Sequence, residues 1–225
     1  AQYQTTTDFV SRMFENNLRD IEPYWVCLPM GSRCAVSNYQ MYWYPWDPDK
    51  EELWVRPMPK MPYIINMDNN PFDFYRYKMV QEDLYAEFGE WYSRQKKGKT
   101  ICLLGIRADE SLNRYRAYAN DRKTIMQGNQ WTTKMGENWW NAYPIYDWTT
   151  KDVWIANGKF DYDYNRIYDL FWKAGLSISQ MRVASPYHES AKESLNLYRV
   201  LEPATWVRVV SRVQGANFGA IYGSS

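Results

Sequence analysis

The chain has 225 residues, long enough for one sizeable core or for a domain with an appendage. It carries 27 Lys and Arg against 26 Asp and Glu, and this near balance excludes the global basic field typical of nucleic-acid-binding proteins. The 12 Trp, 20 Tyr and 8 Phe favour an aromatic-rich core over stacking platforms for bases, which need a groove of basic residues beside them.

The cysteines Cys27, Cys34 and Cys102 form an odd set without CxxC spacing. This pattern predicts neither a disulfide framework nor a zinc or iron–sulfur site, and Cys27 and Cys102 lie in apolar runs typical of buried thiols. The sequence shows no apolar run of about 18 residues and no signal peptide before its first helical pattern. We therefore expect a cytoplasmic protein that does not enter a membrane.

The amino-terminal part predicts a helix that leads into a buried strand. Residues 5–8 offer helix-capping hydroxyls and a carboxylate. Apolar residues follow at helical spacing: Phe9, Val10, Met13, Phe14 and Leu18. Residues 21–30 predict a short strand, which completes the repeating unit of a parallel α/β sheet, and residues 31–39 predict another short helix.

A Pro- and Trp-rich stretch occupies residues 40–68, and its Pro density favours an irregular excursion or a small hairpin with a short strand at 63–65. Residues 71–95 have the strongest helical pattern of the chain. Its large side chains recur every three or four residues: Phe74, Tyr77, Val80, Leu84, Phe88 and Trp91. The lysines and glycine of 96–99 predict the end of this helix.

Residues 101–105 form an apolar run that predicts a buried strand, and a dense set of charged groups follows at once. Ligands of open α/β sheets bind just beyond the carboxyl ends of strands. Arginine forks bind phosphate or sulfate bidentately, and a helix predicted at 111–120 would add backbone N–H groups. The sequence therefore predicts an anion site at Arg107, Ser111 and Arg114.

Two acidic residues within the same run, Asp109 and Glu110, are expected to orient the arginines or to contact ribose hydroxyls. The alternative for the whole run is a surface capping turn with incidental ion pairs. His188 is the only histidine, so this chain can build no triad or multi-histidine metal site without it, and we interpret it as a structural or surface residue.

The second half of the chain predicts mostly helices. Residues 121–140 are expected to be loop and 143–148 a short extended segment, after which Thr149 begins a helix with Asp152 in its first turn. Further predicted elements are a helix at 165–174, a helical pair at 189–201 and 204–213 broken at Pro203, and a Gly-spaced loop at 214–220.

Two segments resemble motifs of the phosphoadenosine phosphosulfate (PAPS) reductase family. Residues 105–114, Gly-Ile-Arg-Ala-Asp-Glu-Ser-Leu-Asn-Arg, resemble its Gly-x-Arg-x-x-(Glu/Gln)-Ser-x-x-Arg element. Residues 143–154 are similar to its Pro-Ile-x-Asp-Trp-x-x-x-Asp-Val-Trp element, and the order and separation of the two also match. Residues 160–223 resemble the extra carboxyl-terminal domain of unknown function in the immunoglobulin-binding-regulator branch of this family.

This resemblance implies an α/β fold of the adenine-nucleotide α-hydrolase type, with a partial parallel sheet, helices on both faces and a mainly helical carboxyl-terminal region. The implied domains are a nucleotide-binding domain at 1–158, with residues 40–68 as an insert, and a carboxyl-terminal domain at 159–225. The implied ligand is ATP or PAPS, with Mg²⁺ if ATP is used and with no iron–sulfur cluster.

The resemblance also implies roles for individual residues. Arg107, Ser111 and Arg114 would face the phosphate or sulfate of the nucleotide. Asp147 and Trp148 would lie near the same edge. Thr5 and Thr6, with the threonine after them, would follow the family's second strand, close to the nucleotide.

Two departures from the family pattern qualify this function. The pyrophosphate loop Ser-Gly-Gly-Lys-Asp-Ser is absent, which implies that the chain starts after the family's second strand. No cysteine follows Cys102, which excludes thiol-based reduction at the family's carboxyl-terminal motif. We expect a longer protein that binds an adenine nucleotide and activates or transfers a sulfur- or phosphate-bearing group, while this chain alone is inactive. The alternative is a non-catalytic regulatory module that contacts a protein or a nucleic acid.

Overall fold

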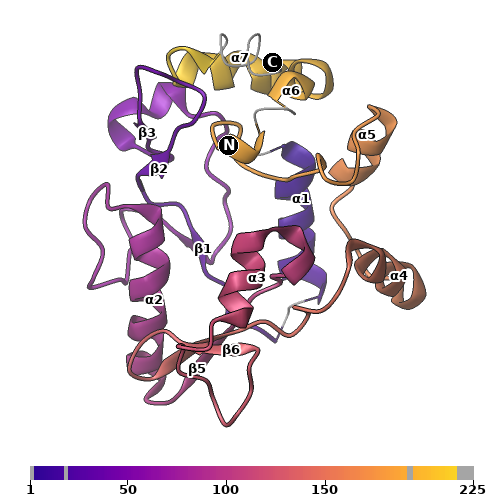
Figure 1. Ribbon diagram of the computed structural model, residues 1–225. Helices are drawn as coiled ribbons and strands as arrows, with labels where there is room; N and C mark the ends of the chain where they lie inside the picture. The colour runs from indigo at the N-terminus through magenta and orange to yellow at the C-terminus, as the bar shows by residue number, and fades with distance from the viewer. Residues whose placement is uncertain (1–2, 18–19, 192–194, 217–225) are drawn as a thin grey trace. The chain divides into compact units, whose positions relative to one another are not determined.

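The computed structural model describes residues 3–17, 20–191 and 195–216 (Figure 1). Contacts group the chain into two compact units. The first comprises residues 1–71, 76–81 and 164–225, and the second comprises 72–75 and 82–163. In this grouping the amino-terminal segment shares a unit with the carboxyl-terminal helices, and the expected domains at 1–158 and 159–225 stay a prediction.

The first unit begins with the predicted helix, α1 (Gln4–Arg12), which continues as a π-helical turn (Met13–Asn17). Its cap differs from the prediction: Tyr3 is the N-cap and makes no side-chain capping bond, so the threonines lie inside the helix. The predicted strands are confirmed as a short parallel pair, in which β1 (Trp25–Val26) lies beside β4 (Ile64–Ile65).

The predicted helix at 31–39 is wrong. This segment contains β2 (Ser32–Arg33), which pairs antiparallel with β3 (Tyr42–Trp43). Backbone hydrogen bonds to distant residues replace the hydrogen bonds of a helix here. For example, the backbone N–H of Gly31 donates to Met79 O at 2.8 Å. The expected excursion at 40–68 is confirmed by this hairpin and a following 3₁₀ helix (Pro48–Leu53).

Helices α5 (Ile167–Lys173), α6 (Leu195–Leu201) and α7 (Pro203–Arg212) confirm the predicted helical region, and Pro203 is the first residue of α7. A 3₁₀ turn (Glu189–Ala191) precedes α6. Apolar side chains from this helical region and from the amino-terminal segment together form the core of the first unit. The core includes Tyr3, Val36 and Trp43 from the amino-terminal segment, and Phe171, Tyr187, Tyr198 and Val209 from the helical region. Residues 217–220 of the predicted Gly-spaced loop lie outside the described residues.

The second unit is organised around α2 (Gln81–Lys96) and a three-stranded sheet. The predicted helix at 71–95 starts about ten residues late, because Phe72 folds back and packs edge-on against Trp91, with 5.0 Å between ring centroids. Its predicted end is confirmed, since α2 stops at Lys96 and Lys97 adopts a positive φ of 49°.

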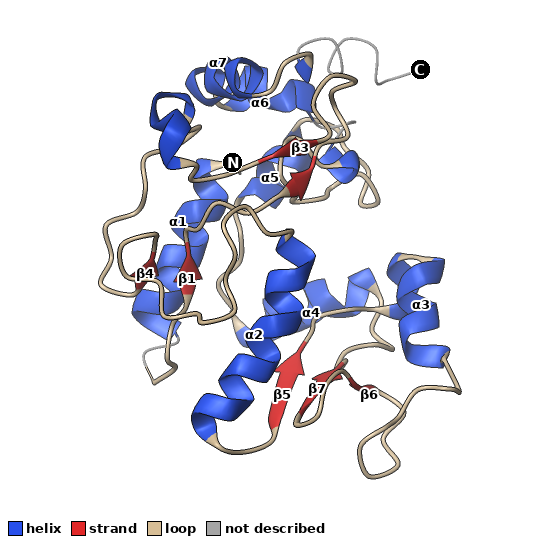
Figure 2. Ribbon diagram, turned by 90° about the vertical axis from the view of Figure 1, so that its left-hand side faces the viewer, coloured by secondary structure: helices blue, strands red, loops and turns tan. Residues whose placement is uncertain are grey.

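The sheet has the order β5-β7-β6 (Figure 2). Strand β5 (Thr100–Leu103) is parallel to β7 (Trp139–Ala142), and β6 (Thr132–Lys134) is antiparallel to β7. The predicted strand at 101–105 exists, but its expected burial is wrong: Ile101 and Leu103 are 48% and 70% exposed, because alternate side chains of β5 point to the more open face of the sheet.

The expected loop at 121–140 is wrong in its second half, which forms β6 and most of the hairpin to β7. The expected extended segment at 143–148 is a turn instead, in which Tyr146 donates to Tyr143 O at 3.2 Å. Helices α3 (Leu112–Ala119) and α4 (Thr150–Phe160) form as predicted, after a 3₁₀ turn (Ala108–Glu110) and the residues that follow β7.

The chain therefore has a mixed α/β fold with small sheets, and it contains two parallel strand pairs among the described residues. No helix in this described part combines the length and apolarity that a membrane span requires.

Candidate functional site

The two motifs lie side by side in the second unit. Because β5 and β7 are parallel neighbours, the residues that follow them emerge at the same sheet edge. The backbone N–H of Ala108 donates to Tyr146 O at 2.7 Å, and that of Thr150 donates to the Asp109 carboxylate at 3.3 Å. We call residues 105–114 and 143–150 the motif edge.

Arg107 is held firmly at this edge and its side chain is only 13% exposed. Its Nη1 pairs with Asp109 at 2.8 Å and its Nε pairs with Glu110 at 3.2 Å, while Nη1 also approaches Trp148 O at 3.5 Å. The acidic residues thus orient the arginine, which is one of the roles the sequence predicts for them. Nη2 makes no contact of this kind within the described residues.

Arg114 lies one helical turn further on and its side chain is half exposed. Its Nε lies 3.6 Å from the second carboxylate oxygen of Glu110, so this one glutamate spans both arginines. The motif edge carries two arginines and three carboxylates, those of Asp109, Glu110 and Asp147, so its formal charge is slightly negative. An incoming anion would therefore have to compete with Asp109 and Glu110 for the guanidinium groups.

Ser111 is the N-cap of α3, and its hydroxyl accepts the backbone N–H of Arg114 at 3.3 Å. This contact satisfies one of the free N–H groups of the first turn. The sequence predicts a phosphate-facing hydroxyl here, and the structure shows that the same oxygen also serves the helix.

Asp147 and Trp148 are both exposed in the turn between β7 and α4. The Asp147 carboxylate forms no ion pair or hydrogen bond with the residues that the structure describes. Nearby, Tyr118 stacks on Tyr146 with 4.0 Å between ring centroids. A hydrogen bond with Tyr118 raises the pKa of Tyr146 above its ordinary value.

Thr5 and Thr6, the other predicted site residues, belong to α1 in the first unit. The Thr6 hydroxyl accepts a hydrogen bond from Asn165 at 2.8 Å. The Thr5 hydroxyl oxygen is buried and has no partner within the described part of the chain. The hydroxyl of Thr6 therefore holds α1 to Asn165, and the roles predicted for Thr5 and Thr6 beside a nucleotide stay predictions.

The thiols are poor nucleophiles in this environment. Burial raises the pKa of Cys27 to about 12, and burial also raises the pKa values of Cys34 and Cys102. His188 is exposed beside the 3₁₀ turn that precedes α6. Across residues 3–17, 20–191 and 195–216, no three His, Cys, Asp or Glu side chains gather closely enough to hold a metal ion.

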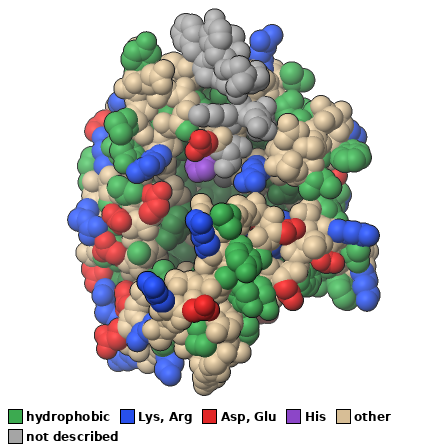
Figure 3. Space-filling view, in the orientation of Figure 1, with side chains coloured by type: hydrophobic (Ala, Val, Ile, Leu, Met, Phe, Trp, Pro, Cys, Tyr) green, Lys and Arg blue, Asp and Glu red, His purple; other side chains and the backbone are tan. Residues whose placement is uncertain are grey.

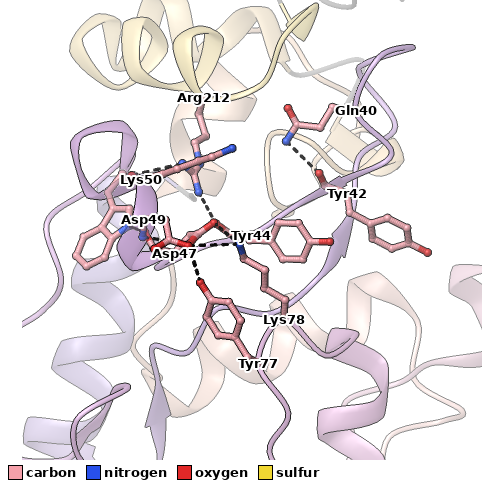
Figure 4. Close-up of polar contacts among 10 residues, drawn as sticks. Gln40, Tyr42, Tyr44, Asp47, Asp49, Lys50, Tyr77, Lys78 and Arg212 are labelled. Carbon is pink, nitrogen blue, oxygen red and sulfur yellow. Dashed lines mark hydrogen bonds and ion pairs between the residues drawn. The ribbon is translucent and has the colours of Figure 1, made fainter.

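Sequence reasoning missed a buried polar cluster in the first unit (Figure 4). Asp47 accepts the hydroxyl of Tyr77 at 3.1 Å and pairs with the ammonium of Lys78 at 3.1 Å. It also accepts the backbone N–H of Asp49 as the N-cap of the 3₁₀ helix. The Asp-Pro pair at 47–48 was the available sequence signal, because Asp is a common N-cap and Pro a common first helical residue.

Comparisons with known proteins identify two likenesses. Residues 175–225 match a family described as a domain of unknown function (DUF3440). The chain is 36% identical over 225 residues to the Uncharacterized protein YbdN of Escherichia coli (strain K12), and the similarity covers 99% of the chain but 54% of the relative. The chain spans about half the length of the curated relative it matches. No solved structure matches it.

The second motif contains a capping box, formed by Thr149 and Asp152, whose hydrogen bonds can be tested by mutation. The Asp152 carboxylate accepts the hydroxyl of Thr149 at 2.7 Å and its backbone N–H at 2.8 Å, and these bonds hold the pKa of Asp152 below its usual value. Thr149→Ala removes the hydroxyl, so we expect the pKa of Asp152 to rise part of the way back. An NMR titration of the carboxyl carbon measures this, with Thr150→Ala as the control. An unchanged pKa in Thr149→Ala would contradict the capping box.

Proposed function

We propose that the motif edge binds an adenine nucleotide, ATP or PAPS, as part of a longer protein that activates or transfers a sulfur- or phosphate-bearing group. The observation that supports this most is the direct contact between the two motifs, where Ala108 donates to Tyr146 O. Each motif alone is a short pattern, whereas two such patterns joined at the carboxyl ends of parallel strands form the usual ligand position of an open α/β sheet.

The side chains at this edge offer suitable contacts for a nucleotide. The Nη2 of Arg107 remains available for an oxyanion, since only Nη1 and Nε are engaged by residues that the structure describes. Arg114 adds an exposed guanidinium, and the amino end of α3 adds backbone N–H groups and the positive end of a helix dipole. The exposed ring of Trp148 offers a face on which a base can stack.

Chemistry at this site would rest on positioning and on charge stabilisation by the arginines. If ATP is the ligand, the carboxylate best placed to help hold Mg²⁺ is Asp147, because Asp109 is already paired with Arg107. The ion would supply charge neutralisation for the phosphates. The arginines would hold the transferred group in place.

Arg107→Ala is expected to weaken nucleotide binding about tenfold or more, because it removes the charge-assisted contact that Nη2 would make with the oxyanion. Isothermal titration of ATP and of PAPS into the full-length protein measures this. Arg116→Ala is the control, since Arg116 lies on α3 just after the first motif, is exposed and has no ion pair with the described residues. Equal affinity of the Arg107→Ala variant and the unchanged protein for both nucleotides would overturn the proposal.

The alternative is a non-catalytic binding module, and the internal pairing of the arginines with Asp109 and Glu110 favours it. On the face drawn in Figure 3, basic and acidic side chains are mixed with exposed hydrophobic ones. A gel-shift titration with RNA and DNA across salt concentrations tests this function, because phosphate-dominated binding weakens steeply with salt. Nucleic-acid binding without nucleotide affinity would select the alternative.

A further inference from the structure

A cavity of about 310 Å³ lies inside the first unit, between α1, the segment after β3 and the end of α7. Its volume is at the lower end of the range of small-molecule pockets. Seven of its thirteen lining residues are tryptophan or proline, and the four tryptophans are Trp25, Trp43, Trp46 and Trp54. Flat, rigid walls of this kind suit a flat apolar ligand.

One buried cation also lines this cavity. Arg212, the last residue of α7, is 8% exposed. Figure 4 shows its side chain reaching from α7 to the segment after β3, where Nη2 donates to Tyr44 O at 2.5 Å and Nη1 to Lys50 O at 3.4 Å. Both acceptors are neutral carbonyls. No carboxylate pairs with this guanidinium anywhere in the described part of the chain.

This arrangement is unusual because a buried charge is normally paired with an opposite one. An arginine has five N–H donors, and the two carbonyls engage only some of them. The other arginine of the cavity, Arg56, differs because it is already neutralised by Glu202 at 2.5 Å. The uncompensated positive charge of the cavity therefore belongs to Arg212.

Trp43, which also lines the cavity, has an unsatisfied donor. The indole N–H of Trp43 is buried and has no acceptor within residues 3–17, 20–191 and 195–216. The Trp43 ring is held edge-on against Tyr187, with 4.6 Å between centroids, so its position is fixed by the core. A buried donor without an acceptor costs free energy.

We propose that this cavity binds a small aromatic carboxylate, with its carboxylate on Arg212 and its ring among the tryptophans. A single uncompensated guanidinium matches a monoanion, and its planar fork matches the geometry of a carboxylate. The apolar wall matches the ring. A nucleotide is larger and carries several charges, for which the cavity has only this one uncompensated cation.

The first test compares two probes of nearly the same shape, the anion indole-3-acetate and its neutral amide indole-3-acetamide, titrated calorimetrically into the unchanged chain. We expect the acid to bind at least about tenfold more tightly, because a hydrogen bond to a charged partner is stronger than one to a neutral amide. Equal affinities, or no binding of either probe at millimolar concentration, would overturn the proposal.

The second test removes the charge. Arg212→Met keeps an apolar stem of similar length and is expected to abolish the preference for the acid over the amide. Arg212→Lys, which keeps the charge but not the fork, should retain part of that preference. Arg199→Met is the control, since Arg199 is exposed on α6. A folded Arg212→Met chain that still prefers the acid would refute the assignment.

Competing ligands give a third test. ATP should not displace indole-3-acetate, and phenyl phosphate should bind more weakly than the carboxylate. Displacement by ATP would assign the cavity to a nucleotide and overturn the proposal, and tighter binding of phenyl phosphate would overturn the choice of a carboxylate. If Arg212→Met fails to fold, as judged by circular dichroism, the titrations of the unchanged chain with the acid and the amide test the proposal by themselves.

Discussion

Asp47→Ala is expected to lower the free energy of unfolding by about 3 kcal/mol, near the lower end of the cost of breaking a buried ion pair. Asp47 is 1% exposed and holds Lys78 and Tyr77 through contacts of 3.1 Å each. The substitution leaves both donors without their acceptor. The loss stays at the lower end because the Lys78 side chain is 31% exposed. Urea unfolding followed by tryptophan fluorescence measures the change.

The same carboxylate gives this stability a pH dependence. Burial raises the pKa of Asp47, but hydrogen bonds from Lys78 and Tyr77 outweigh burial and the pKa is lowered. A lowered folded-state pKa gives stability that is present above the unfolded value, about 3.9, and is lost as the pH falls through the folded value. The difference in free energy of unfolding between the unchanged chain and Asp47→Asn should therefore be largest near neutral pH and become smaller below about pH 4.

Asp49→Asn is the matched control for Asp47. Asp49 lies two residues on and 3.9 Å from the same ammonium, but its side chain is 73% exposed. A solvated ion pair contributes about 0–1 kcal/mol, so we expect little change at any pH. If both substitutions lower the free energy of unfolding by the same amount, the burial of Asp47 does not set the strength of its ion pair.

Gly89→Ala is expected to destabilise the second unit by about 1–2 kcal/mol, although Ala is the better helix former. Gly89 lies in α2 beneath the ring of Trp139 on β7, and an added Cβ would lie 2.5 Å from its Cδ2 atom. The helix or the strand would have to move. That strain exceeds the gain of about 1 kcal/mol in helix propensity. Thermal unfolding of the chain measures the difference.

Gly158→Ala supplies the opposite result as a control. Gly158 lies in α4, and an added Cβ would meet no atom within 4 Å. Here the helix propensity acts alone, and we expect stabilisation by about 0.5–1 kcal/mol. A stabilising Gly89→Ala would show that Trp139 does not press on α2 in the way the structure shows.

The sequence alone determined the elements that local signals control. The capping box of Thr149 and Asp152, the break at Pro203 and the end of α2 at Lys96 each depend on residues within about one helical turn. The sequence also predicted that the two motifs meet at one edge, and the structure brings them together. The nucleotide at that edge stays a prediction.

Tertiary structure alone decided the features that depend on distant partners. Residues 31–39 contain a hairpin strand in place of the predicted helix, because the backbone of Gly31 forms a hydrogen bond with that of Met79, far along the chain. The glycine of α2 is needed only because Trp139 packs on it. Arg212 is buried beside the cavity because it donates to the carbonyl oxygens of Tyr44 and Lys50, more than 160 residues earlier in the chain. Periodicity and capping act over a few residues, so they carry no information on which distant side chains meet.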